Sequence, residues 1–221
     1  MIPWPNPPNP ITATPAALPL HRSSDRRPRE SSAMIDLSAL REKPTLAGER
    51  VNLVPMSAKH ADDFFESTRD EEIRRLTGSH RRPDYDEVRE WCASRSEQLD
   101  RLDLAIIEEP GGRFVGALAL EDVDADNESA GYRIALSAIE FTGQGLGKEA
   151  TRLVLDYAFN RVRLHRVWLN VYAFNMRAIA VYRSYGFTVE GRLRDALLWD
   201  ERRHDALIMA VLESEFRSAA G

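Results

Sequence analysis

Three alternating glycines followed at once by a helical pattern constrain this chain more than any other segment. The segment reads FTGQGLGKEATRLVLDYAF from Phe141 to Phe159, and its glycines are Gly143, Gly145 and Gly147. Glycine lets the backbone approach a ligand and turn its amides inward without interference from a Cβ atom. A helix that begins directly behind them adds unpaired N–H groups and the positive end of a macrodipole. The segment therefore predicts a binding site for a phosphate or pyrophosphate, with a plain glycine-rich turn as the alternative interpretation.

Two common phosphate-binding motifs do not fit the spacing. A Walker loop needs glycine five positions before its Gly-Lys pair and a hydroxyl residue after the lysine. Here Thr142 stands five positions before Gly147, and Lys148 is followed by Glu149. A dinucleotide fingerprint that starts at Gly143 needs a third glycine where Lys148 stands. The glycine loop belongs to neither class.

Composition restricts the class of protein further. The chain has 221 residues, of which 43% are hydrophobic, so one domain with a sizeable core is expected. A formal net charge of −5 argues against nucleic acid as a partner and favours a cationic substrate as a tendency. Cys92 is the only cysteine and the histidines lack metal-ligand spacing, so neither a disulfide nor a metal site is expected. With no membrane-spanning run and no secretory signal in the sequence, we expect a cytoplasmic protein.

The chain divides into an extension and a domain. Residues 1–33 are first proline-rich and then polar and charged, a composition that cannot supply a core. Residues 34–43 lead into the globular pattern. We predict a disordered N-terminal extension over residues 1–43 and a single domain over residues 44–221.

Hydrophobic periodicity predicts alternating strands and helices in this domain. Strands are expected at residues 50–55, 102–107, 114–120, 132–136, 165–172, 187–189 and 206–212. Helices are expected at residues 60–68, 84–99, 145–161 and 175–185. The turn Pro110-Gly111-Gly112 predicts a hairpin between two of the strands. The strand-loop-helix-strand order between residues 130 and 172 predicts a parallel crossover in an otherwise hairpin-rich sheet, so the fold class is mixed α/β or α+β.

Four phrases in this order resemble the GCN5-related N-acetyltransferases (GNAT), and among them the RimJ/RimL-like branch. They are PTLAGERVNLVPM at residues 44–56, GQGLGKEA at 143–150, LNVYAFNMRAIAVYRSYGF at 169–187 and EGRLRDALLWDERRHDALIMAVLESEF at 190–216. The resemblance covers roughly residues 44 to 216. It implies a mixed, mostly antiparallel central sheet flanked by helices, and acetyl-coenzyme A as the co-substrate without a metal.

The resemblance also implies which residues contact the co-substrate. In this family the main-chain amides of the glycine loop bind the pyrophosphate, and the end of the preceding strand pairs with the pantetheine arm. The residues that these roles fall on are Leu136, Ser137, Gly143, Gln144, Gly145, Leu146, Gly147, Lys148 and Asn175. Asn175 is equally well placed to cap the helix that follows it.

The resemblance also implies catalytic residues, at positions where members of the family differ from one another. Tyr182 would protonate the leaving thiolate, although periodicity alone is explained as well by packing on a helix. Asn170 stands where some relatives carry a glutamate, and it would orient a water because an amide cannot take a proton. Glu128 would act as a base only if its strand points it inward. Glu121 and Glu140 are further carboxylates whose orientation the sequence leaves open.

The reaction expected is transfer of an acetyl group to a primary amine. Without an obvious base, an α-amine is favoured over a lysine, because its pKa near 8 leaves about one tenth of it neutral at pH 7. The acceptor would be a protein N-terminus or an amino-acid-like small molecule. The alternatives are an enzyme that inactivates an amine antibiotic or toxic amine, and a non-catalytic coenzyme A-binding relative. Specificity is expected in residues 74–100 and around Leu198, Trp199 and Arg202, in a monomer or homodimer.

Overall fold

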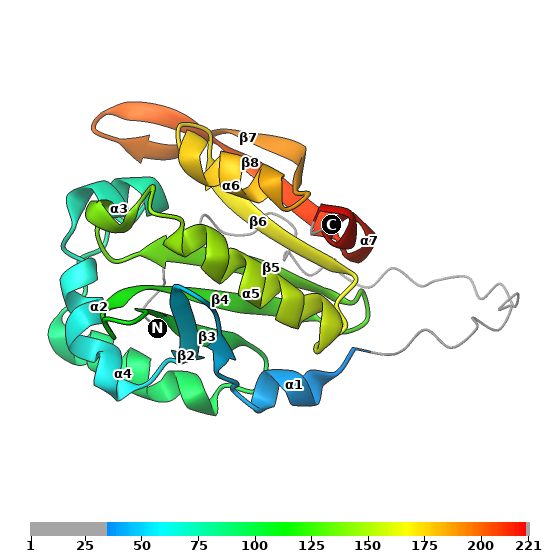
Figure 1. Ribbon diagram of the computed structural model, residues 1–221. Coiled ribbons are helices and arrows are strands. Elements are labelled where there is room, and N and C mark those ends of the chain that lie inside the picture. The colour runs from blue at the N-terminus through cyan, green and yellow to red at the C-terminus, as the bar shows by residue number, and fades with distance from the viewer. Residues whose placement is uncertain (1–34, 220–221) are drawn as a thin grey trace, which may run out of the picture.

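The computed structural model describes residues 35–219, which form one eight-stranded sheet covered by helices (Figure 1). The strands are β1 (Leu46–Ala47), β2 (Val51–Pro55), β3 (Leu102–Glu108), β4 (Phe114–Asp124), β5 (Ser129–Leu136), β6 (Arg166–Tyr172), β7 (Thr188–Trp199) and β8 (Arg202–Leu212). The helices are α1 (Leu37–Arg41), α2 (Ala61–Ser67), α3 (Glu71–Thr77), α4 (Tyr85–Ser94), α5 (Leu146–Asn160), α6 (Met176–Ser184) and α7 (Glu213–Ala219). None of these helices is both long and apolar enough to cross a membrane.

The sheet is antiparallel except at one position. Its order is β1-β2-β3-β4-β5-β6-β8-β7, and only the β5–β6 pair is parallel among these strands. The long crossover that a parallel pair requires is supplied by the glycine loop and α5. The predicted fold class, a mixed and mostly antiparallel sheet flanked by helices, is confirmed.

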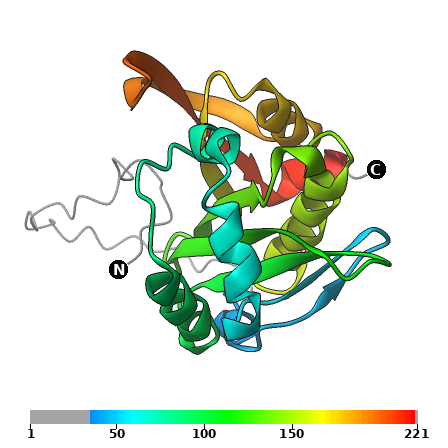
Figure 2. The same ribbon diagram turned by 90° about the vertical axis from the view of Figure 1, so that its left-hand side faces the viewer.

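Two cores lie on the two faces of this sheet. One face packs against α5 and α6, with Leu104 and Ile106 of β3 turned toward them. The other face packs against α2 and α4 and receives Ala105 of the same strand, because successive strand side chains point to opposite faces. Figure 2 shows α4 and α5 on opposite sides of the molecule.

Several elements differ from those predicted. The helix α1 holds Ala39 and Leu40 in the core, 1% and 0% exposed, so the domain begins before residue 44 and the predicted boundary is corrected. Residues 1–34 lie outside the described part of the chain. The helix α3 and most of the β7–β8 hairpin were not predicted. The α4 helix does begin after Asp84, which forms a capping box with Glu87.

The parallel pair β5–β6 creates the opening in which the site lies. The two strands pair only between residues 129–131 and 166–168. Beyond these residues β5 continues to pair with β4, and β6 continues to pair with β8. The edges of β5 and β6 that face each other therefore separate into a wedge.

Candidate active site

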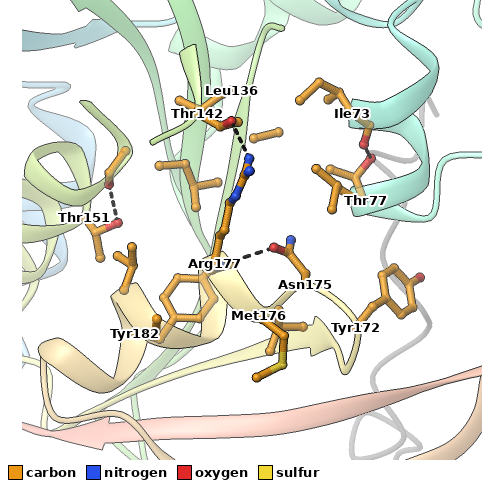
Figure 3. A pocket seen from close by; sticks show the side chains of 18 of the residues that line it. Ile73, Thr77, Leu136, Thr142, Thr151, Tyr172, Asn175, Met176, Arg177 and Tyr182 are labelled. Carbon is orange, nitrogen blue, oxygen red and sulfur yellow. Dashed lines mark hydrogen bonds between the residues drawn. The ribbon is translucent and has the colours of Figure 1, made fainter. Parts of the chain in front are cut away.

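A cavity of about 920 Å³ fills this wedge. Its walls are the second half of β5, the end of β6, the glycine loop with the start of α5, α6 from Met176 to Tyr182, and α3. In Figure 3, Ile73 and Thr77 of α3 lie across the cavity from Thr151 and Tyr182. Five separate segments thus meet at one place, which makes the wedge the candidate active site.

The glycine loop forms one end of the cavity and has the backbone that the sequence predicts. Gly143 and Gly145 have φ angles of 75° and 85°, a region that favours glycine. Gly145 is the N-cap of α5, and its missing side chain leaves the first amides of the helix without a side-chain partner. A Cβ atom added at Gly143 would meet nothing within 4 Å, so the space beside the loop is open. The loop can accept an anion on its amides.

Contacts with the β1–β2 turn hold this loop in place. The Glu149 carboxylate accepts hydrogen bonds from the backbone N–H groups of Glu49, at 2.5 Å, and Arg50. The Arg50 guanidinium also donates to the Gln144 carbonyl. Glu149 therefore attaches the start of α5 to the β1–β2 turn. Of the other loop residues, Gly147 and Lys148 line the cavity.

Two of the predicted loop residues lie outside the cavity lining. Leu146 is 1% exposed and belongs to the core. The Gln144 side chain turns back to donate to the Glu140 carbonyl, at 2.8 Å. Any contribution of these two residues to binding must therefore come from their backbone groups.

The edge of β5 offers backbone groups to the cavity. The Ser137 N–H donates to the Val115 carbonyl of β4, at 2.9 Å. Since strand residues alternate between their two neighbours, Tyr132, Ile134 and Leu136 turn their backbone N–H and C=O groups toward the wedge. Leu136 is thus placed as predicted, whereas Ser137 is occupied by β4 and does not line the cavity.

The N-terminus of α6 forms the opposite side of the cavity mouth. The Asn175 side chain accepts a hydrogen bond from the Ala178 N–H, at 3.2 Å, so its predicted capping role is confirmed. Asn175 also lines the cavity. Arg177 reaches across to the glycine loop and donates to the Thr142 hydroxyl, at 3.0 Å (Figure 3). The sequence interpretation gave Arg177 no role, although it lies two residues after Asn175 in the same phrase.

Tyr182 presents an unpaired hydroxyl in the wall of the cavity. It lines the cavity, is 7% exposed, and its hydroxyl has no hydrogen-bond partner among residues 35–219. Burial raises its pKa, so the phenol stays protonated. The neighbouring tyrosines are already engaged: Tyr132 shares a hydrogen bond with Thr151, and Tyr185 donates to the Lys148 carbonyl, both at 2.9 Å.

Asn170 presents a second unpaired polar group. It lies on β6 and lines the cavity, and its buried Oδ1 atom has no partner within the described chain. A buried acceptor without a donor is costly, so this atom is suited to a water or an amine in the cavity. Tyr172 follows two residues later on the same face of β6, also lines the cavity, and has its pKa raised by burial.

The carboxylates considered as bases do not reach the cavity. Glu128 precedes β5 and does not line it; it lies four residues, about 13 Å along an extended strand, before Tyr132. Its backbone carbonyl receives the N–H groups at the start of β6 instead. Glu121 is buried in ion pairs with Arg133 and Arg101, and Glu140 is exposed on the loop. Glu128 therefore lies outside the candidate site, because it stands in the turn before β5.

The α3 helix forms the wall that the sequence interpretation missed. Asp70 caps it by accepting from the Ile73 N–H, at 2.9 Å, and Gly78 ends it with a φ of 71°. The sequence does contain a signal for this helix: an N-capping Asp70 and a glycine, Gly78, eight residues later. The Arg75 guanidinium packs 4.6 Å from the ring centre of Phe174, which fixes α3 over the end of β6.

In the described part of the chain, the cavity lining holds neither a cluster of metal ligands nor a thiol. Among the described residues, no three histidine, cysteine or acidic side chains gather as metal ligands. Cys92 is buried under α4, away from the cavity, and burial raises its pKa to about 12. A buried thiol with a raised pKa is unreactive.

The comparison with known proteins agrees with this geometry. The family model described as an acetyltransferase (GNAT) domain matches residues 50–188. This is more than half of the chain, which therefore belongs to the GNAT acetyltransferase family.

Individual relatives are more distant. The spermidine N(1)-acetyltransferase of Escherichia coli (strain K12) is 28% identical over 117 residues, 53% of this chain and 62% of that protein. The putative ribosomal N-acetyltransferase YdaF of Bacillus subtilis (strain 168) is 34% identical over 107 residues, 48% of this chain and 57% of that protein. The matched parts thus span less than two thirds of these relatives. The crystal structure of spermidine N-acetyltransferase from Vibrio cholerae in complex with CoA and spermine shares the fold, with a TM-score of 0.70 and 20% identity over 77% of this chain and 99% of that chain.

Proposed function

We propose that the protein is an N-acetyltransferase that transfers the acetyl group of acetyl-coenzyme A to an α-amine. The acceptor is a protein N-terminus or an amino-acid-like small molecule. The observation that carries the proposal is the wedge between β5 and β6, which joins the glycine loop, a free strand edge and the unpaired Tyr182 hydroxyl in one cavity.

The cavity residues fit the donor substrate. The open glycine loop and the N-terminus of α5 suit a pyrophosphate. Lys148 and Arg177 line the same end and supply positive charge. The free edge of β5, with Leu136 at its end, suits the amide groups of the pantetheine arm, which can pair with it as an added strand.

Tyr182 and Asn170 would donate and accept the hydrogen bonds through which protons move in the reaction. As the amine nitrogen bonds to the acetyl carbon, the carbon–sulfur bond breaks and the Tyr182 hydroxyl gives its proton to the leaving thiolate. The Asn170 Oδ1 atom accepts a hydrogen bond from the attacking amine or from a water that carries the amine proton away. The phenolate of Tyr182 then regains a proton from solvent.

The absence of a strong base favours an α-amine. Within the described part of the chain, Glu72 is the one carboxylate that lines the cavity, and its hydrogen bonds with Arg75 lower its pKa. A weak base suits an amine that is already partly neutral. At pH 7 about one tenth of an α-amine is neutral, but well under a thousandth of a lysine amine.

A thiol-release assay tests this proposal. Purified protein is mixed with acetyl-coenzyme A and a panel of acceptors: peptides with free and blocked N-termini, amino acids, lysine side-chain analogues, polyamines and aminoglycosides. Thiol release with free α-amines, and none with blocked ones, is the expected result. Binding of acetyl-coenzyme A without thiol release from any acceptor would instead support a non-catalytic relative.

A further inference from the structure

The charges that line the cavity have the opposite sign from the chain as a whole. The chain carries a formal net charge of −5, yet the cavity lining contains four cationic side chains and one carboxylate. Lys148 and Arg177 lie at the end assigned to the donor's phosphates. The other charges, Glu72, Arg75 and Arg133, lie elsewhere in the lining.

The position of these three charges follows from the alternation of β5. The Tyr132 hydroxyl reaches Thr151 of α5, so the next side chain, Arg133, points to the opposite face of the sheet. The helix α3, with Glu72 and Arg75, closes the cavity across from α5 (Figure 3). Together they form the wall that remains for the acceptor once the donor occupies the side of α5 and α6.

Glu72 adds no free negative charge to this wall. Both its oxygens are held by Arg75, whose Nε and Nη2 atoms each donate to it at 2.7 Å. Arg75 keeps its Nη1 group without a hydrogen bond among the described residues, and Phe174 holds its guanidinium in place. Arg75 therefore retains a donor for an anion at Nη1, while the charge of Glu72 is already offset by Arg75.

The charged groups around Arg75 and Arg133 add no free carboxylate to this wall. Arg74, the neighbour of Arg75, is 6% exposed and leaves its Nε atom without a partner. Glu121, the partner of Arg133, is buried behind it and does not line the cavity. Asp200 in the β7–β8 turn attracts Arg75 more weakly than Glu72 does and is also outside the lining. A second ammonium group on the acceptor would therefore meet no unpaired carboxylate among the described residues that line the cavity.

We infer that the acceptor carries its amine on an anionic or neutral segment, that Arg75 recognises the charge of that segment, and that polyamines are excluded. This inference rests on the proposed function and narrows its acceptor class. It also distinguishes this chain from the spermidine enzymes to which it is similar.

Three matched peptides test the inference. The tripeptide amides Ala-Ala-Glu, Ala-Ala-Gln and Ala-Ala-Lys share one α-amine and differ in a single charge; spermidine is the fourth acceptor. We expect kcat/KM to fall in the order Glu, Gln, Lys and then spermidine. One charge pair in a partly exposed site gives a difference of about tenfold between the first and third peptides, and salt should reduce it.

Charge reversal at Arg75 is the second test of the inference. Arg75→Glu should invert the order of the Glu and Lys peptides, while Glu72→Gln, which frees Arg75, should widen the original preference. Arg69→Glu is the matched control, because Arg69 is exposed and lies outside the cavity; it should leave the order unchanged. Circular dichroism checks that each variant folds, and Arg75→Gln, expected to abolish the preference, replaces Arg75→Glu if that variant does not.

The outcomes separate the two proposals. Spermidine or the Lys peptide as the best acceptor would overturn the inference while leaving the acetyltransferase activity intact. An unchanged peptide order in the Arg75 variants would remove Arg75 as the recognising group. Absence of thiol release with every acceptor would instead refute the proposed function, and the inference would fall with it.

Discussion

Tyr182→Phe is the sharpest test of the proposed chemistry, because it removes one atom that the fold does not use. The hydroxyl makes no hydrogen bond within residues 35–219, and the ring is held by packing against Tyr132 and Phe187, with ring centres 6.4 and 5.6 Å away. Phenylalanine keeps this packing. Any loss of activity must then come from the missing proton.

The expected effects on activity and on stability differ strongly. Loss of a positioned general acid costs about 10²- to 10⁴-fold in kcat, which corresponds to about 3–5 kcal/mol of transition-state stabilisation. The free energy of unfolding should stay unchanged or rise slightly, because no protein hydrogen bond is lost. The KM for acetyl-coenzyme A should also stay near its original value, because the glycine loop and β5 are untouched.

Tyr157→Phe is the matched control. Tyr157 is equally buried, but its hydroxyl donates to the Ala39 carbonyl at 2.7 Å, outside the cavity. This variant should lose about 1–3 kcal/mol of unfolding free energy and keep its kcat. Steady-state thiol release and urea unfolding measure both quantities. Unchanged turnover in Tyr182→Phe, or a fall matched by an equal rise in the donor KM, would refute the assignment of Tyr182 as the acid.

The pH profile gives an independent check of the same residue. A general acid must be protonated, so activity is lost only as pH rises through its pKa, and burial moves the pKa of Tyr182 above the ordinary value. The log of kcat/KM should therefore rise with pH until the acceptor amine is neutral near pH 8, then stay level to at least about pH 10. A falling limb between pH 7 and 9 would point to a different acid.

Three further variants test the cavity. Gly145→Val places a branched residue at a φ of 85°; it should raise the donor KM and cost about 1–2 kcal/mol of stability, as measured by titration and urea unfolding. Asn170→Ala should lower kcat/KM for the acceptor without lowering the melting temperature, since its Oδ1 atom has no partner in the described chain; a less stable variant with normal kinetics would contradict this. Gly116→Ala should destabilise the fold by about 1–3 kcal/mol or more, because its Cβ would lie 2.4 Å from the Ala135 carbonyl; Gly147→Ala, whose nearest neighbour would be 3.8 Å away, is the stability control.

The net charge of the chain does not report the charge that lines the cavity. An acidic composition favours a cationic ligand only if the acidic residues face it. Here the carboxylates nearest the site are paired: Glu72 with Arg75, and Glu121 with Arg133 and Arg101. The charges of the described lining that have no carboxylate partner, Lys148 and Arg177, are cationic. Charge counted along a sequence does not report which charges are neutralised by partners distant in the chain.

Dependence on distant partners also explains why Glu128 and Ser137 were expected in the site but do not line the cavity. Glu128 and Ser137 flank β5 in sequence, as the wedge residues do, but a strand offers alternate residues to alternate neighbours. The partner on each side, and the residue at which β5 and β6 separate, depend on β4 and β8. No pattern within β5 itself contains this information.

What the sequence determined alone is local. The conformation of the glycine loop, the helix behind it and the Asn175 cap depend on residues within a few positions of one another, and all are found where predicted. The tertiary structure decided the rest. Separation of β5 from β6 opens the cavity, α3 closes it over Arg75 and Phe174, and burial leaves the Tyr182 hydroxyl unpaired. These properties arise from contacts between distant segments, and they place the glycine loop at one end of a cavity that several segments enclose.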